Sequence, residues 1–282
     1  MEYHPSSPTP APPMPVPGQI ASLATTSQLG TFSRCYEAQT PLAVIGTGLL
    51  ISVLAILVLG LLLLIATFLH VAFGSLALLL LMIPVLAVVY MIGGVLRSGH
   101  KVYVFRHGII ACQGSQITVL PWNQIQQIFH QQSWAVTLSS WKAEHVYRLT
   151  LHDAQSQTVE LSSYIRGVKE LGQIIEEAVA SHLLPHEMQH YRSGNSVFFG
   201  PFSISPQGLT STTKGQILPW HEVKSVDYVG NIITNRGNYG LRYVGVTKHD
   251  GTIWTAALET QIPNLALLFQ MVREITPNSS AQ

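Results

Sequence analysis

A long stretch without charged residues constrains this chain more than any other feature. From Ala38 to Leu96 the sequence contains no Asp, Glu, Lys or Arg, and His70 is the single group there that titrates near neutral pH. A helix needs roughly 20 apolar residues to cross a bilayer core about 30 Å thick. The stretch is too long for one crossing and sufficient for two. It therefore predicts a membrane α-helical hairpin with spans at about residues 42–68 and 76–96.

Cations flank the predicted spans at their outer ends only. Arg34 precedes the first span, and Arg97 and Lys101 follow the second, whereas the turn between the spans has no Lys or Arg. Because cytoplasmic segments carry an excess of Lys and Arg, both termini are expected in the cytoplasm. The sequence thus predicts a multi-pass membrane protein that has the lipid bilayer as a partner.

Residues 1–33 form a tail rich in Pro, Ser, Thr and Ala, with seven prolines between Pro5 and Pro17. Such a composition offers few side chains to bury and does not offset the entropy lost on ordering. The tail is therefore predicted to be disordered, with polyproline character. Its PxxP spacings fit a docking peptide, but a plain spacer is the simpler interpretation.

The sequence after the uncharged stretch repeats itself. Leu120-Pro121-Trp122 returns 98 residues later as Leu218-Pro219-Trp220, and Gly108-Ile109 returns as Gly208-Leu209. Self-similarity at this spacing indicates two copies of one structural unit. Within the repeated motif, the two tryptophans are expected to be core anchors at the start of a strand.

Each copy begins with short alternating strand patterns and ends in an amphipathic helical pattern, at residues 166–181 and 261–275. That order fits a pleckstrin-homology-like (PH-like) split barrel, which a C-terminal helix closes. We therefore expect an α+β, mainly-β soluble part made of two tandem PH-like split barrels. An unrelated α+β sandwich made of two halves is the alternative. The expected boundaries are residues 100–184 for the first unit, 185–196 for a linker, 197–277 for the second unit and 278–282 for a tail.

Several short motifs give the chain a resemblance to a known group of proteins. They are Leu29-Gly30, Tyr103-Val104-Phe105-Arg106-His107-Gly108, Leu120-Pro121-Trp122, Val197-Phe198-Phe199-Gly200 and Ile262-Pro263-Asn264. In this order they resemble an uncharacterised bacterial family of two-span membrane proteins with PH-like domains, over most of residues 29–277. The resemblance implies the same fold, a place in the cell inner (plasma) membrane, and no assigned catalytic residues.

One motif points to a different class of protein. His186-Glu187-Met188-Gln189-His190 has the HExxH pattern, in which two His one helical turn apart bind zinc and the Glu acts as a base. However, Pro185 and Gly194 limit any helix here to about two turns, and no third ligand is evident. A short surface helix is expected, with no metal, no cofactor and no catalytic residue. A membrane zinc metallopeptidase that uses His186, Glu187 and His190 is the alternative.

Charge in residues 97–282 is nearly balanced, with 14 Lys and Arg against 12 Asp and Glu. Because there is no basic run, nucleic acid is not expected as a partner. The cations Lys214, Lys224, Arg236 and Arg242 are scattered, so an anionic lipid is a secondary candidate. We therefore expect a non-enzymatic binding or scaffold protein that presents its two units to a protein or lipid partner.

Overall fold

The computed structural model describes residues 16–38, 100–136, 143–155, 157–233 and 240–276, together with isolated residues between 46 and 89. Among these residues, no helix is both long and apolar enough to cross a membrane. The predicted spans at 42–68 and 76–96 lie, apart from isolated residues, outside the described residues. The predicted tail at 278–282 lies outside them as well.

The predicted fold class is corrected accordingly. The described residues form four antiparallel sheets and few helices, with no hairpin of membrane helices among them. The predicted multi-pass inner-membrane location is corrected on the same finding. An uncharged composition is by itself insufficient evidence of a crossing, because a span also requires one continuous helix of about 20 apolar residues, which none of the described helices provides.

The first unit consists of two antiparallel sheets, with strand orders β1-β2-β3-β4 and β5-β6-β7. The strands are β1 (Phe32–Glu37), β2 (Lys101–Phe105), β3 (Gly108–Gln113), β4 (Gln116–Pro121), β5 (Ile125–Val136), β6 (Ala143–Asp153) and β7 (Thr158–Ser162). Strand β1 comes from before the uncharged stretch, and Glu37 pairs there with Lys101, whose Nζ lies 2.7 Å from the carboxylate. The unit therefore includes residues far upstream of its predicted start at residue 100.

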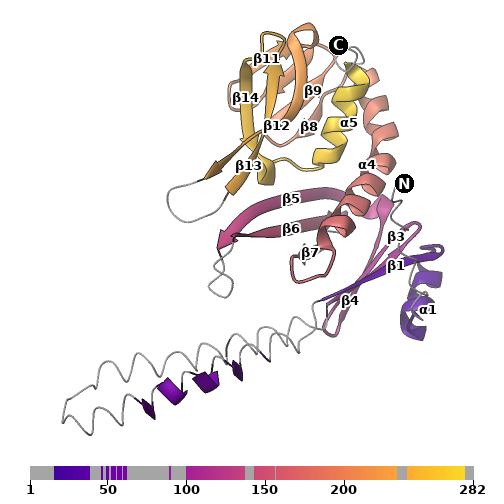
Figure 1. Ribbon diagram of the computed structural model, residues 1–282. Coiled ribbons are helices and arrows are strands. Elements are labelled where there is room, and N and C mark those ends of the chain that lie inside the picture. The colour runs from indigo at the N-terminus through magenta and orange to yellow at the C-terminus, as the bar shows by residue number, and fades with distance from the viewer. Residues whose placement is uncertain are drawn as a thin grey trace, which may run out of the picture.

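The second unit repeats this arrangement, with strand orders β11-β10-β9-β8 and β12-β13-β14. The strands are β8 (Val197–Phe199), β9 (Phe202–Ser205), β10 (Gly208–Ser211), β11 (Gln216–Pro219), β12 (Val223–Ile233), β13 (Gly240–Lys248) and β14 (Ile253–Leu258). The 3₁₀ turn η3 (Glu259–Gln261) leads into helix α5 (Leu265–Ile275). Figure 1 shows this unit in orange and yellow beside the magenta strands of the first.

Each unit has a hydrophobic core of its own, enclosed by its two sheets and a helix. The repeated tryptophans begin the 3₁₀ turns η1 (Trp122–Gln124) and η2 (Trp220–Glu222), which connect the two sheets of each unit. The Trp122 indole N–H donates to the Arg106 carbonyl oxygen, and that of Trp220 to the Ser205 carbonyl oxygen. Trp122 lies in the first core as predicted, and Trp220 packs against the second.

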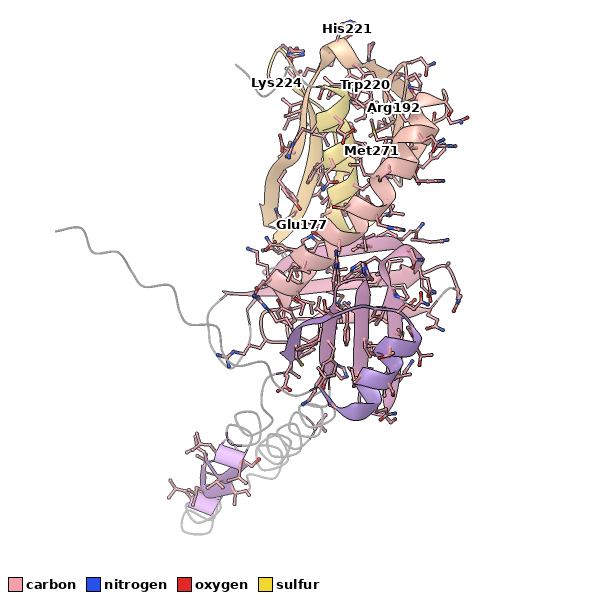
Figure 2. The ribbon with its side chains drawn as sticks, turned by 90° about the vertical axis from the view of Figure 1, so that its right-hand side faces the viewer. Glu177, Arg192, Trp220, His221, Lys224 and Met271 are labelled. Carbon is pink, nitrogen blue, oxygen red and sulfur yellow. The ribbon has the colours of Figure 1, made fainter. Side chains whose placement is uncertain are left out.

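One long helix, α4 (Val168–Arg192), is shared by the two cores. Its first half buries residues such as Leu171 in the first core, and Met188 in its second half belongs to the second core. Figure 2 shows this course, with Glu177 near the level where the units meet and Arg192 in the second unit. The predicted linker at 185–196 is therefore wrong for most of its length. Burial against the second core offsets the helix-breaking tendency of Pro185.

Helix α1 (Gly18–Thr26) lies within the segment that was predicted to be disordered. Ile20 and Ala24 are buried and pack against Tyr103 on the outer face of the β1–β4 sheet. These few apolar residues have little influence on the average composition of the tail. Their burial against the outer face of the β1–β4 sheet stabilises the helix. Residues 1–15 of the tail lie outside the described residues.

Candidate functional site

The two units meet where the start of α5 contacts the open edge of strand β5. The Asn264 N–H donates to the Ile128 carbonyl oxygen over 2.9 Å, and the Ile128 N–H donates back to Asn264 Oδ1 over 2.9 Å. Asn264 Nδ2 also donates to the Gln126 carbonyl oxygen. Asn264 has a φ of 53°, a left-handed conformation that Asn tolerates better than most residues. One asparagine thus satisfies three backbone groups on the edge of strand β5.

Beside this contact, the carboxylate of Glu259 is the centre of a buried polar cluster. The residue is 1% exposed. Its Oε1 accepts a hydrogen bond from the Tyr228 hydroxyl at 2.8 Å and lies 3.0 Å from His130 Nδ1. The Gln132 N–H donates to Oε2 at 3.3 Å, and Arg242 Nη1 lies 3.7 Å from Oε1. Glu259 from the second unit therefore has polar partners from both units.

Arg242 is the cation of this cluster. Its guanidinium lies 3.5 Å above the ring of Tyr228, close enough for a cation–π interaction, and it donates a hydrogen bond to Gln132 of the first unit. Its side chain is 23% exposed. The sequence suggested Arg242 as one of several scattered cations for lipid, whereas the structure places it between the two units.

On the first unit's side, the cluster contains His130 and two neighbours. Its Nδ1 lies 3.5 Å from the Glu176 carboxylate, and its ring centroid lies 4.6 Å from that of Tyr147. The Tyr147 phenol packs against helix α4 at Gly172, where a Cβ would stand 2.0 Å from the hydroxyl oxygen. Among the described residues, neither His130 Nε2 nor the Tyr147 hydroxyl has a hydrogen-bond partner. The rings of His130 and Tyr147 are therefore held mainly by packing, and each has one polar atom without a hydrogen bond among the described residues.

The junction shifts the pKa values of its two carboxyl groups, Glu176 and Glu259, in opposite directions. Burial raises the pKa of Glu176, and the nearby charge of Glu259 raises it further, although His130 and Arg242 oppose this. Burial also acts to raise the pKa of Glu259, but the His130 and Tyr228 hydrogen bonds and the charge of Arg242 outweigh it, and that pKa is lowered. Burial raises the pKa of both phenols, Tyr147 and Tyr228. Glu259 is thus the group that favours a negative charge, and Glu176 favours a proton.

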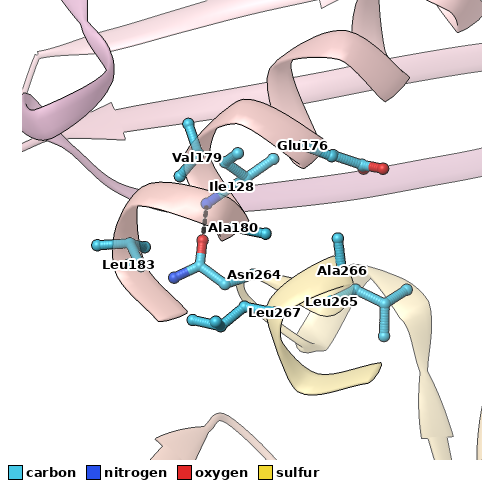
Figure 3. A pocket seen from close by; sticks show the side chains of 9 residues that line it. All are labelled: Ile128, Glu176, Val179, Ala180, Leu183, Asn264, Leu265, Ala266 and Leu267. Carbon is cyan, nitrogen blue, oxygen red and sulfur yellow. Dashed lines mark hydrogen bonds between the residues drawn. The ribbon is translucent and has the colours of Figure 1, made fainter. Parts of the chain in front are cut away.

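A small cavity adjoins the cluster, between α4, β5 and the start of α5. It has a volume of about 10 Å³, and Figure 3 shows its lining together with the hydrogen bond between Asn264 and Ile128. Its lining residues are Ile128, Glu176, Val179, Ala180, Leu183, Asn264, Leu265, Ala266 and Leu267. A single water needs roughly 10–15 Å³. The cluster therefore adjoins space for about one water and not for an organic substrate.

The HExxH motif lies elsewhere, on the second half of α4. The His186 side chain is 78% exposed, and its Nδ1 lies 3.3 Å from Glu187 Oε1. His190 is also exposed, and Met188 between them is the residue that packs inward. Within the described part of the chain, no group of three or more His, Cys, Asp or Glu residues is arranged to hold a metal ion.

A second depression of about 280 Å³ lies in the first unit, next to the end of α1. Its lining residues are Ser27, Gln28, His107, Pro121, Trp122, Asn123 and His182. Most of these side chains are exposed, and the Trp122 indole N–H already donates to a backbone carbonyl. The depression is open and polar but lacks a buried, unpartnered group that points to a ligand.

The outer faces of the two four-stranded sheets differ. In the second unit, strand pairing places Phe198, Ser203, Thr210 and Ile217 in one row across the face. Phe198 is 71% exposed and Ile217 is 53% exposed. The equivalent row of the first unit lies in the cluster under α1 and consists of Cys35, Tyr103, Ile110 and Val119. One face is thus covered by a helix, and the other presents two large apolar side chains to solvent.

Sequence reasoning did not find the cluster. Its members come from β5, β6, α4, β12, β13 and η3, and they have no characteristic spacing in the sequence. The one signal near it is Ile262-Pro263-Asn264, one of the short motifs that carry the family resemblance. Asn264 of this motif is the residue that contacts strand β5.

Comparison with known proteins gives one family, whose match covers residues 14–281 and whose description is "family of unknown function (DUF6585)". The match includes both repeated units and the segment between them. No curated protein matches the chain. The binding role and the absence of enzyme activity expected from the sequence stay predictions.

Proposed function

We propose that this chain, which belongs to the family of unknown function DUF6585, is a non-enzymatic binding protein that presents two joined β units to a protein partner. The outer face of the second unit, defined by Phe198, Ser203, Thr210 and Ile217, is the proposed contact surface. The observation that carries the proposal is the exposure of Phe198 and Ile217 on a face whose counterpart in the first unit is covered by helix α1.

Physical considerations support a contact surface at this place. Large side chains that remain exposed on a sheet face gain free energy when a partner removes them from water, about 1.5–3 kcal/mol for each that becomes fully buried. Aromatic and aliphatic anchors of this kind dominate the energy of many protein interfaces. Ser203 and Thr210 between them are small, and Ser203 is buried while Thr210 is half-buried, so the two apolar side chains are the exposed part of the row.

The junction supports a scaffold role in the same proposal. Helix α4 enters both cores, and Asn264, Glu259 and Arg242 connect the units through hydrogen bonds and ion pairs. Such an arrangement fixes the orientation of two units without creating a space for substrate. A partner would therefore meet both units in one defined geometry.

The alternative of a zinc metallopeptidase at His186, Glu187 and His190 has less support. Both histidines lie on the solvent-facing side of α4, and zinc-peptidase chemistry needs a further ligand and a site that excludes bulk water. No third ligand stands beside them among the described residues. The motif is better explained as the polar face of a helix whose Met188 packs on the second core.

The proposal is tested by copurification with the full chain from its native cells. The wild type is compared with a double variant, Phe198→Ser with Ile217→Ser. The matched control is Ile253→Ser, which removes an equally exposed side chain (54%) from strand β14 of the other sheet. A protein that copurifies with wild type and control, and at least about tenfold less with the double variant, is the expected result, since 1.4 kcal/mol corresponds to tenfold in affinity.

Equal recovery of every copurifying protein by the double variant and the wild type would show that this face is not the contact surface. The purified chain is also mixed with liposomes of neutral and anionic composition. Binding to anionic liposomes that Phe198→Ser with Ile217→Ser leaves unchanged would favour a lipid surface over a protein partner.

A further inference from the structure

The junction holds two carboxyl groups but a single permanent cation. Glu176 and Glu259 lie beside the guanidinium of Arg242 and the imidazole of His130. A second uncompensated carboxylate is strongly unfavourable in a buried site. His130 Nδ1 lies 3.0 Å from Glu259 and 3.5 Å from Glu176, so its hydrogen bond is directed to Glu259. Glu176 is therefore the carboxyl group that carries a proton, in agreement with its raised pKa.

This proton lies between the units and not inside either core. His130, Tyr147 and Glu176 belong to β5, β6 and α4 of the first unit, whereas Tyr228, Arg242 and Glu259 belong to β12, β13 and η3 of the second. The hydrophobic cores are separate clusters on either side. A change of charge here acts first on the contact between the units.

We infer that the junction is a proton-operated latch. It holds the two units together while Glu176 carries a proton, and it opens when that proton is lost. The inference concerns regulation and stands independently of the partner-binding face proposed above.

The geometry gives the direction of the effect on the alkaline side. When the Glu176 proton leaves, two carboxylates remain near one another with a single permanent cation, Arg242, and the hydrogen bonds to Glu259 do not extend to Glu176. The raised pKa of Glu176 agrees with this. Because the closed state binds the proton more tightly than the open state, the stability of the junction falls as pH rises through the closed-state pKa.

On the acid side, the stability of the junction falls as pH falls, and Glu259 is the group responsible. Glu259 has a lowered pKa in the closed junction, so its contribution is complete above its ordinary pKa. That contribution is lost as pH falls through the lowered value, when Glu259 no longer attracts His130 and Arg242. The junction is therefore most stable near the ordinary pKa of Glu. Its stability falls on the acid side until pH passes the lowered pKa of Glu259, and on the alkaline side until pH passes the raised pKa of Glu176.

Amide hydrogen exchange of the full chain tests the latch across a pH series, with rates corrected for intrinsic exchange. The reporters are the Ile128, Gln132 and Asn264 amides, which all donate across the junction. The references are the amides of β3 and β9 in the two cores. Above the ordinary pKa of Glu, the opening constant of the reporters should rise about tenfold per pH unit, as expected for a one-proton event, and level off above the raised pKa of Glu176, while the references stay protected.

Two variants separate the latch from general effects of pH. Glu176→Gln replaces the protonated carboxyl by a neutral group of the same shape, so its reporters should stay protected at alkaline pH. Glu177→Gln changes the next, exposed residue of α4, whose charge contributes the last and smallest of the effects on the pKa of Glu176, and this variant should retain the alkaline loss of protection. The latch is rejected if Glu176→Gln retains the alkaline loss of protection, if the wild type shows no such loss, or if the core references lose protection at the same pH.

Discussion

At the scale of the residue, the structure gives special importance to positions without a sequence motif. Gly172 is a residue of helix α4 that allows the Tyr147 phenol to lie on the helix surface. Glu259 is buried yet satisfied by donors from both units. Each has a role that depends on a neighbour distant in the sequence, and each gives a prediction.

Gly172→Ala should destabilise the protein even though Ala favours helices. The added Cβ would stand 2.0 Å from the Tyr147 hydroxyl oxygen, so the ring must move out of a filled space. Overpacking of this kind costs about 1–3 kcal/mol. Denaturant unfolding measures the loss, and combining Gly172→Ala with Tyr147→Leu should recover part of it. A stability equal to or above that of the wild type would contradict the assigned packing.

Truncation of two ion-paired glutamates, Glu259 and Glu222, should lower the free energy of unfolding by very different amounts. Glu259→Ala leaves Arg242 and His130 without their buried partner, which should cost about 3–5 kcal/mol. Glu222→Ala breaks the pair with Lys248, whose Nζ lies 3.0 Å away, but the Glu222 side chain is 42% exposed. Exposed pairs contribute about 0.2–1 kcal/mol. Urea unfolding of both variants provides the comparison, and similar losses would show that burial does not distinguish the two sites.

At the scale of the element, helix α4 is the part that most changes the interpretation of the sequence. A proline in mid-sequence predicts a helix boundary because it removes one hydrogen bond and crowds the preceding turn. The helix nevertheless continues from Val168 to Arg192, since Leu183 and Leu184 on one side and Met188 on the next turn pack on the cores. Tertiary burial outweighs the local preference of a single residue.

Pro185→Ala should therefore stabilise the protein. The proline is exposed, so its replacement removes no buried contact, and it restores a backbone N–H within the helix. Interior Pro is about 3 kcal/mol less favourable than Ala in a helix, and a gain of roughly 1–3 kcal/mol is expected. The thermal midpoint reports it. A lower midpoint would indicate that the helix needs a break at this residue.

At the scale of the whole molecule, the question is whether two repeated units unfold as one. Their cores are separate, but α4 enters both, and Asn264 connects the second unit to strand β5 of the first. Cooperativity between the units therefore depends on a small number of contacts. This makes the coupling of the units accessible to a single substitution.

Asn264→Gly is expected to weaken that coupling. Gly retains the left-handed backbone conformation at φ 53° but removes two side-chain hydrogen bonds, to Ile128 and Gln126. A loss of about 1–3 kcal/mol follows from two such bonds. Calorimetry should show a van't Hoff enthalpy below the calorimetric enthalpy, the sign of units that unfold separately. An unchanged ratio would mean that α4 alone maintains the coupling.

Much of the repeated part could be predicted from local pattern, and the junction could not. Leu120-Pro121-Trp122 and its second copy revealed the repeat, because the same turn between two sheets requires the same residues in both units. Strand β1 was missed because its partner Lys101 lies 64 residues downstream of Glu37, beyond any hairpin signal. The cluster around Glu259 was missed for the same reason, since pairing of residues so far apart leaves no spacing to recognise.

Local patterns in the chain predict the repeat, its strands and the terminal helix of the second unit, since alternation and helical periodicity are local properties. They also predict membrane spans, and among the described residues no helix is long and apolar enough for one. The folded structure was needed to show that α4 continues through Pro185, that α1 covers one sheet face, and that Glu176 and Glu259 lie near one guanidinium. Those outcomes depend on burial between segments distant in sequence, and burial is fixed only when the chain has folded.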